Sequence, residues 1–257
     1  MTFSEQIVYG MTKPSKYKEI LELKKRRFVL YVFVLVIALA IMSYAIPTAA
    51  IITGFGGFEK LFTKNLAPLE FCQGELNIER PFDMSIGYAH IVVDSSEDVV
   101  TSDKIHKDGI YYAVGKQKLT LAYCLDGKIL QKQDVNLNLL LPEGFNNQAL
   151  CNMIPGIYTF LVLGFFVTAL GFFLRYGFYT LLIAVCVNAM SKRINTGLSF
   201  GKVFTLCFYG QSLAMVVSNV NFALGLLPSM IVSIIGFFVT IHFITTALIS
   251  MSKINQV

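Results

Sequence analysis

The chain contains 257 residues, of which 55% are hydrophobic and only 14% are charged, and its formal net charge is +5. A soluble domain ordinarily carries about 25% charged residues. This composition excludes a soluble enzyme, an intrinsically disordered chain and a free nucleic-acid-binding protein, and it indicates an integral membrane protein built from apolar helices.

The charges are divided unevenly along the chain. Residues 1–27 carry a net charge of +4, residues 28–150 carry −4, and residues 151–257 carry +5 without any acidic residue. The basic residues flank apolar segments, which is the usual pattern on the cytoplasmic side of a membrane protein. The pattern therefore predicts a lipid bilayer, and not nucleic acid, as a partner, and it places both termini in the cytoplasm.

Residues 1–27 contain apolar residues that recur among lysines with rough helical spacing. This spacing predicts one or two short amphipathic helices on the inner leaflet, and the alternative is a basic flank that only stops translocation. Each basic residue near the surface would contribute about 1 kcal/mol of binding to anionic lipid. The residues predicted to contact lipid head groups are Lys24, Lys25, Arg26 and Arg27.

Residues 28–53 form the first predicted transmembrane helix, because they carry no charge and exceed the length needed to cross the hydrocarbon core. The segment is longer than the apolar core of a signal peptide, although the small residues at 45–49 leave cleavage there as an alternative. Pro47 is expected to kink or end this helix, since proline lacks the backbone N–H of a helix interior.

Residues 54–150 have the composition of a domain exposed to water. Short runs alternate between apolar and polar residues, which is typical of strands, and turn signals lie at 73–74, 108–109 and 126–127. We predict a compact, mostly β extracytoplasmic domain inserted between the first and second transmembrane helices. Its strands are expected at 69–72, 75–78, 89–93, 110–114, 119–123 and 129–137.

Residues 153–190 are predicted to form one long second transmembrane helix, about 57 Å in length at 1.5 Å per residue. Two short spans around Arg175 are the alternative, and they would give five spans in place of four. The basic Lys192 and Arg193 favour one crossing, because it returns them to the cytoplasmic side. The third and fourth helices are expected at 202–226 and 229–250, followed by a cytoplasmic tail at 251–257.

The candidate site residues are polar side chains within these apolar helices. Such residues either line a cavity or form hydrogen bonds between helices, and we expect mainly the second. An intramembrane ionisable residue is a functional candidate by default, but a neutral histidine bonded to a neighbouring helix is the more common case. The predicted intramembrane polar interface comprises Arg175, Asn188, Gln211, Ser218, Asn219 and His242. Gly164 and Gly171 are expected to permit close helix approach.

The predicted extracytoplasmic domain offers few chemical motifs. A disulfide between Cys72 and Cys124 is conceivable on an oxidising face, and two unpaired, half-buried thiols are the alternative. The histidines show no metal-ligand spacing, and no cofactor or nucleophile motif is present. We therefore predict no cofactor, metal or catalytic site. The acidic cluster is expected to be a solvated loop and not a calcium site; its members are Asp94, Glu97, Asp98 and Asp103.

The order of these features resembles a bacterial multi-pass membrane family of unknown function that is common in Gram-positive bacteria. Some members carry the name maltodextrin-utilisation protein MalA, and the family is grouped loosely with Yip-like membrane proteins. The resemblance implies four spans, an outer domain, a cell-membrane location and no catalytic residues. It rests on the segments 13–16, 46–47, 69–78, 91–96, 191–193 and 198–210.

Three functional hypotheses follow. The first is a non-enzymatic accessory protein that binds or regulates another membrane protein, such as a solute-import system. The second is a sensor whose outer domain binds a ligand such as a saccharide and signals through a partner. The third, a transporter or membrane enzyme, has the least support because no acidic residue follows Glu143. The tyrosines that suit either saccharide stacking or a β core are Tyr88, Tyr111, Tyr112 and Tyr123, and we favour the core.

Overall fold

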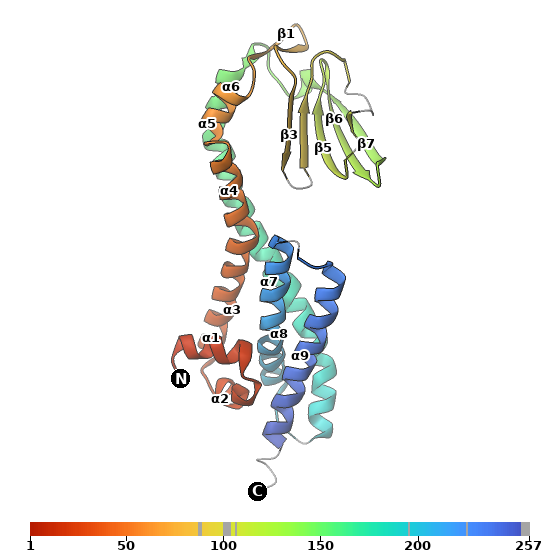
Figure 1. Ribbon diagram of the computed structural model, residues 1–257. Helices are drawn as coiled ribbons and strands as arrows, with labels where there is room; N and C mark the ends of the chain where they lie inside the picture. Colours follow the sequence, from red (N-terminus) through yellow and green to blue (C-terminus); the bar gives the residue numbers. More distant parts are fainter. Residues whose placement is uncertain (87–88, 100–103, 106, 195, 225, 253–257) are drawn as a thin grey trace. The chain divides into compact units, whose positions relative to one another are not determined.

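The computed structural model describes residues 1–86, 89–99, 104–105, 107–194, 196–224 and 226–252. They divide into two compact units, whose elements are labelled in Figure 1. The helical unit comprises Met1–Thr48 and Val162–Val257, and the sheet unit comprises Ala49–Leu161. The predictions for Tyr88, Asp103, His106 and residues 253–257 of the tail lie outside the described residues.

Four helices in the described part of the chain are long and apolar enough to cross a membrane. The second of them, α7, is one uninterrupted helix of 40 residues, where the sequence allowed one long helix or two short ones. Its most apolar stretch has only 6% of its residues buried. The four span Lys25–Gly54, Ile154–Arg193 (α7), Phe200–Asn221 within α8 (Phe200–Leu224), and Ser229–Ser252 (α9).

The first of these helices continues past Pro47, contrary to one of the two expectations for that residue. It consists of α3 (Lys25–Ala40), a π-helical turn η2 (Ile41–Ala45) and α4 (Ile46–Gly54). A proline ring clashes with the carbonyl four residues earlier, and a wider turn just before the proline changes the local hydrogen-bond pattern. The helix therefore accommodates Pro47 by a π turn and ends only at Gly54.

Close contacts at small residues join α8 to α9. A Cβ added at Gly210 would lie 2.8 Å from Ile244 Cγ1, and one added at Gly236 would lie 3.1 Å from Ala214 Cβ. Asn221 closes the connection, because its amide nitrogen donates to the Leu227 carbonyl and its oxygen accepts from the Leu227 N–H, both at 2.9 Å. Because glycine has no side chain, Gly210 and Gly236 let α8 and α9 approach closely.

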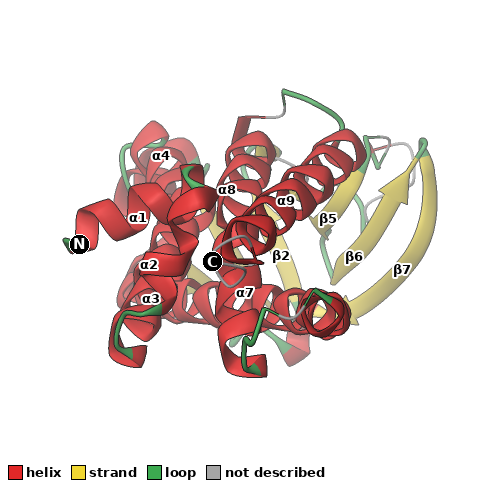
Figure 2. Ribbon diagram, turned by 90° about the horizontal axis from the view of Figure 1, so that it is seen from below, coloured by secondary structure: helices red, strands yellow, loops and turns green. Residues whose placement is uncertain are grey.

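The predicted short helices near the N-terminus are present as α1 (Phe3–Thr12), the 3-10 turn η1 (Pro14–Lys16) and α2 (Tyr17–Leu21). Thr2 and Glu5 form a capping box at the start of α1. Figure 2 shows α1 and α2 lying across the end of the helical unit. Tyr17 and Ile20 are almost fully buried, so apolar side chains of this segment pack against the other helices of the unit.

A buried group of polar and aromatic side chains holds this N-terminal segment in place. The Gln6 amide nitrogen donates to the Tyr209 hydroxyl at 2.6 Å and to the Arg27 carbonyl at 3.3 Å. The Tyr17 hydroxyl donates to the Gly10 carbonyl at 2.7 Å. The rings of Tyr31 and Tyr209 lie 4.4 Å apart between centroids. Burial raises the pKa of Tyr17, so this hydroxyl stays protonated as a donor.

The sheet unit contains two sheets. The first has the order β2-β1-β8, and the second has the order β3-β4-β5-β6-β7, in which only the β4–β5 pair is parallel. Most strands lie where the alternation predicted them, whereas β3 and β8 were not predicted. The strands are β1 (Leu69–Cys72), β2 (Glu75–Ile78), β3 (Phe82–Ile86), β4 (Ala89–Val93), β5 (Gly109–Val114), β6 (Lys118–Leu125), β7 (Lys128–Asn136) and β8 (Phe145–Asn146).

Two of the predicted turns are tight hairpins. Gln73-Gly74 joins β1 to β2, and Asp126-Gly127 joins β6 to β7; all four residues have positive φ angles. Two consecutive positive φ angles match the twist of the flanking strands, which explains the glycine in each pair. Beyond the strands, the unit contains α5 (Phe58–Lys60), the π turn η3 (Leu61–Asn65), the 3-10 turn η5 (Leu137–Leu139) and α6 (Asn147–Asn152).

The five-stranded sheet has two different faces. On one face, Ile105 from the β4–β5 connection packs with Tyr111, Ala113 and Cys124. On the other face, the three-stranded sheet and its surroundings cover only one end of the strands, where they contact Val93, Val114 and Leu119. The rest of this second face is not covered by the described part of the sheet unit.

We predict that Gly10→Ala loosens the N-terminal segment. The added Cβ would lie 2.6 Å from Tyr209 Cδ1, and overpacking of this kind costs about 1–3 kcal/mol. Limited trypsin digestion of the detergent-solubilised protein should then cleave faster after Lys16 and Lys18.

Gly171→Ala is the matched control, because nothing lies within 4 Å of its Cβ position. It should leave the cleavage rate unchanged. Equal cleavage of wild type and Gly10→Ala would contradict the close contact between α1 and α8.

Candidate functional site

The helical unit contains a pocket with a volume of about 380 Å³. This volume falls within the range of small-molecule sites, which is about 300–1,000 Å³. The pocket lies between η2, α7, α8 and α9, and most of its lining side chains are polar. They are Ser43, Tyr44, Thr168, Arg175, Tyr176, Ser218, Asn219, Asn221, Ser229 and Ser233, with Phe172 and Val232 as the apolar members.

Arg175 is the one charged residue in the lining. Its guanidinium lies 5.7 Å from the ring centroid of Tyr176 and 5.9 Å from that of Tyr179. In the described part of the chain Arg175 forms no ion pair. Arg175 is exposed, so its guanidinium is accessible to a group that enters the pocket.

Two hydroxyl groups in the lining lack the hydrogen bond to a backbone carbonyl that other helical hydroxyls nearby form. Ser43 and Ser233 each donate to the carbonyl four residues earlier, at 2.8 Å. The side-chain hydroxyls of Ser218 and Thr168 make no hydrogen bond with any described residue. Because a hydroxyl hydrogen rotates freely, both can donate to a group bound in the pocket.

Only some residues of the predicted polar interface lie together in one site. Arg175, Ser218 and Asn219 line the pocket. Asn219 also donates to the Leu39 carbonyl at 3.5 Å, which links α8 to α3. Gln211 lies elsewhere on α8, where it donates to the Tyr176 carbonyl at 3.2 Å and to the Thr180 hydroxyl.

Asn188 and His242 do not belong to the pocket. Asn188 is half-buried on α7 and has no hydrogen-bond partner among the described residues. His242 is exposed on α9, where its ring contacts Phe243. The expectation that His242 bonds to a neighbouring helix is wrong, because the residue faces away from the other helices of this unit.

The wall of the pocket also contains residues that the sequence did not identify. Thr168 precedes Arg175 by two helical turns, so its spacing on α7 was a usable signal. Tyr44 gave no such signal, because its position depends on contact between α7 and η2. Gly164 permits that contact, since a Cβ there would overlap the Tyr44 hydroxyl, whereas Gly171 has nothing within 4 Å.

The uncovered face of the five-stranded sheet is a second candidate site. Four of its apolar residues are more than two-fifths exposed: Ile110 46%, Tyr112 44%, Tyr123 42% and Leu125 41%. Ile110 pairs with Tyr123, and Tyr112 pairs with Leu121, so the two tyrosines are diagonal neighbours on one face. We call this surface the open sheet face. A contiguous apolar surface of this kind marks an interaction site more often than isolated exposed residues do.

The three described tyrosines among those suggested by the sequence have different positions. Tyr111 is buried and stacks on His90 at 4.6 Å, as the core interpretation predicted. Tyr112 and Tyr123 instead belong to the open sheet face. Two exposed amides lie beside them on β7, since Gln131 pairs with Tyr123 and Gln133 pairs with Leu121.

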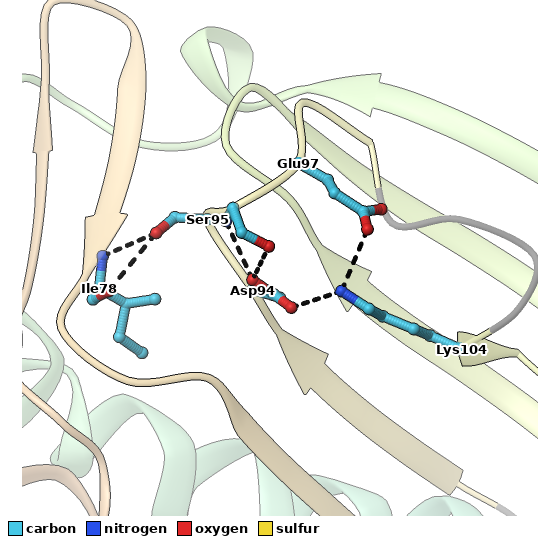
Figure 3. Close-up of polar contacts among 6 residues, drawn as sticks. Ile78, Asp94, Ser95, Glu97 and Lys104 are labelled. Carbon is cyan, nitrogen blue, oxygen red and sulfur yellow. Dashed lines mark hydrogen bonds and ion pairs between the residues drawn. The ribbon is translucent and has the colours of Figure 1, made fainter.

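The acidic loop is held by an ion pair (Figure 3). Asp94 is only 6% exposed, and its carboxylate lies 2.5 Å from the Lys104 ammonium group. It also accepts from the Ser96 N–H at 2.9 Å and the Ser96 hydroxyl at 2.6 Å. Glu97 lies 3.3 Å from the same ammonium group, and Ser95 accepts from the Ile78 N–H of β2 at 3.1 Å.

These contacts determine the charge state of Asp94. Burial by itself raises the pKa of Asp94, but the hydrogen bonds from Lys104 and Ser96 outweigh it and lower the pKa to about 2. The carboxylate is therefore ionised and already has partners. In the described part of the chain, no group of three or more histidine, cysteine, aspartate or glutamate residues lies together as a metal site would require.

The structure contains no bond between Cys72 and Cys124, so the disulfide considered from the sequence is absent. Cys72 is exposed at the end of β1, and Cys124 is fully buried in β6 of the other sheet. The two thiols are thus not equivalent half-buried groups either. His90 is a satisfied core residue, with Ser85 Oγ 2.8 Å and the Asp108 carbonyl 3.2 Å from its ring nitrogens.

The basic residues predicted to contact lipid lie at the start of α3. Lys24, Lys25 and Arg26 are exposed, and Arg27 is half-buried. The Arg27 guanidinium donates to the Met1 carbonyl at 3.1 Å. Three of the four side chains are therefore exposed, while Arg27 also anchors the N-terminal residue.

One comparison with known proteins gives a match. The family described as "Protein of unknown function (DUF1189)" matches residues 5–251, which is nearly the whole chain. No curated protein and no solved structure matches the chain.

We predict that the sheet unit loses stability in acid through Asp94. Its pKa is about 2 in the folded chain and about 3.9 when unfolded, so the ionised carboxylate stabilises the fold above pH 4. That contribution, about 2–3 kcal/mol, is lost as the pH falls from 4 toward 2. Urea unfolding followed by tyrosine near-UV circular dichroism at pH 6 and pH 2.5 measures the difference.

Asp94→Asn should be less stable than wild type at pH 6 and should approach it at the lower pH. Asp126→Asn is the control, because asparagine also tolerates the positive φ angle at that turn. An Asp94→Asn variant as stable as wild type at pH 6 would refute the role assigned to this ion pair.

Proposed function

We infer that this chain, which belongs to the DUF1189 family of proteins of unknown function, is a non-enzymatic membrane accessory protein. It binds or regulates another membrane protein, and a solute-uptake system, such as one for maltodextrin, is a candidate. In this proposal the four apolar helices span a bacterial cell membrane, both termini are cytoplasmic, and residues 54–150 are extracytoplasmic.

The open sheet face is the observation that carries this proposal. An apolar helix surface is covered by lipid, but in the proposed orientation this sheet faces water. Tyr112 and Tyr123 supply large amphipathic contact areas of the kind that dominates protein interfaces, and Ile110 and Leu125 extend the apolar area. Leaving these groups uncovered costs free energy in proportion to their exposed apolar area.

The proposed occupant is an apolar segment of the extracytoplasmic part of a partner membrane protein. The open sheet face is continuous with the surface on which the three-stranded sheet already packs, at Val93, Val114 and Leu119. The same strands thus pack against one apolar layer within the chain, and the uncovered part of their face can take an apolar segment of the partner. The edge strand β7 carries exposed Lys128 and Lys132, which oppose edge-to-edge pairing and favour binding to the face.

A ligand sensor is the second candidate function. Tyr112 and Tyr123 can stack on a saccharide ring, and the neighbouring amides of Gln131 and Gln133 can bond to its hydroxyl groups. A sensor would still need a partner protein for output, because the proposed cytoplasmic segments are short. A transporter or membrane enzyme has less support, since the sequence contains no acidic residue after Glu143.

We predict that Tyr112→Asp reduces recovery of the partner about tenfold or more, because a charge in the centre of an apolar interface is desolvated without compensation. The measurement is photo-crosslinking in the native membrane, with a photoreactive phenylalanine at position 123 in chains with and without Tyr112→Asp. Mass spectrometry then identifies and compares the adducts.

Leu139→Asp is the matched control, since Leu139 is 79% exposed in the same unit but lies outside the five-stranded sheet. It should leave the adduct unchanged. One membrane-protein adduct that is lost with Tyr112→Asp and kept with Leu139→Asp supports the accessory function. An adduct suppressed by added maltodextrin favours the sensor, and the absence of any specific adduct at position 123 would refute partner binding at this face.

A further inference from the structure

We propose that the pocket around Arg175 binds the anionic head group, a phosphate or carboxylate, of a membrane amphiphile. The inference rests on the side chains of the helical unit alone. It is independent of the open sheet face, so either proposal can fail without the other.

The charge balance of the helical unit is the first argument. Arg175 lines the pocket, and the apolar helices carry no acidic residue: none lies between Glu22 and Glu59, and none follows Glu143. The chain therefore supplies no carboxylate to neutralise this guanidinium. A cation in such an environment is stabilised by an anion bound from outside, and guanidinium forms two parallel hydrogen bonds with a phosphate or carboxylate.

The donors around Arg175 are the second argument. The Ser218 and Thr168 hydroxyls line the same pocket and have no hydrogen-bond partner in the described part of the chain. The first turn of α9 also reaches it, through Ser229 and Val232. The amide end of a helix carries a partial positive charge, which adds to the field of Arg175. The lining thus offers donors from three helices and no carboxylate.

The position of the pocket along the helices favours an amphiphile over a purely soluble ion as its ligand. Ser218 and Asn219 lie about 28 Å along α8 from Phe200, at 1.5 Å per residue, which approaches the thickness of the hydrocarbon core. Ser229 lies at the start of α9. The pocket is therefore at the level of lipid head groups on the side opposite to the basic residues of α3.

The surroundings of the pocket suit the tail of such a ligand. Phe172 and Val232 are the apolar members of the lining, and Phe178 (59% exposed) and Leu182 (50% exposed) follow Arg175 on α7 in the direction of the membrane core. An acyl chain can lie along this apolar helix surface while its head group occupies the polar pocket. A volume of about 380 Å³ accommodates a head group, which leaves the tail outside.

The test measures lipid retention and stability of the full-length protein in mild detergent. Phosphatidylglycerol, phosphatidylcholine, glycerol phosphate and inorganic phosphate are added separately. Native mass spectrometry counts the retained lipid, and thermal unfolding reports stabilisation. Phosphatidylglycerol should be retained and should raise the melting temperature, whereas phosphatidylcholine should do so weakly. Arg175→Gln should reduce phosphatidylglycerol retention about tenfold or more, as expected for loss of a charge-assisted hydrogen bond.

Two further variants separate the pocket from general basic charge. Arg175→Lys keeps the charge and should restore part of the retention. Lys25→Gln removes a positive charge at the start of α3, where lipid contact is also expected, and should leave the Arg175-dependent lipid in place. Ser218→Ala should weaken retention less than Arg175→Gln does, because only one neutral donor is removed.

Each result decides the proposal. Stabilisation by glycerol phosphate or inorganic phosphate equal to that by phosphatidylglycerol, and lost in Arg175→Gln, retains the anion site but assigns it to a soluble ligand. Phosphatidylglycerol retention that Arg175→Gln leaves unchanged, or that Lys25→Gln abolishes, overturns the assignment to this pocket. Arg175→Gln protein that is folded and unstabilised by every anion supports it.

Discussion

In the proposed membrane setting, the arrangement of the helical unit depends on one constraint: hydrophobic burial gives apolar helices little preference for each other over lipid. Specific packing must then come from close approach at small residues and from the few polar side chains. Both occur here. Gly210 and Gly236 bring α8 against α9, and Gly10 admits the Tyr209 ring to the surface of α1. Gln211 and Gln6 supply the polar contacts, each reaching a different helix. Loss of such a contact is not compensated by apolar area.

The same constraint explains why the polar pocket is notable. Most polar groups in the helices are occupied, either by a neighbouring helix or by a carbonyl of the same helix. Arg175, Ser218 and Thr168 lack such partners in the described part of the chain and converge on one space. In the sheet unit the opposite situation holds, because water competes for polar groups and the unoccupied surface is apolar. The two candidate sites are thus recognised by related criteria. In the pocket, polar groups lack hydrogen-bond partners, and on the open sheet face, apolar side chains lack a cover.

Much of the secondary structure could be predicted from the sequence. The first strand and the second were placed at their observed ends, since alternation and a Gln-Gly turn define them locally. The strand β3 was missed because it begins directly after Pro81 and carries Asp83 and Ser85, so its composition resembles a loop. The two-residue β8 has no periodicity to detect, and it exists only because β1 is beside it. Helix bounds were close, but Pro47 did not end its helix, because a π turn accommodates it.

The sequence by itself determined the class of the protein: four apolar helices, a basic N-terminal segment and an inserted region of short strands. These properties depend on composition and on periodicities of a few residues, which need no knowledge of distant contacts. Only the tertiary structure decided which polar residues meet. It separated Gln211 and His242 from Arg175, added Thr168 and Tyr44 to the pocket, kept Cys72 and Cys124 apart, and left Tyr112 and Tyr123 uncovered. Such choices depend on the rotation of each helix and the register of each strand, which are set by packing between residues far apart in the chain.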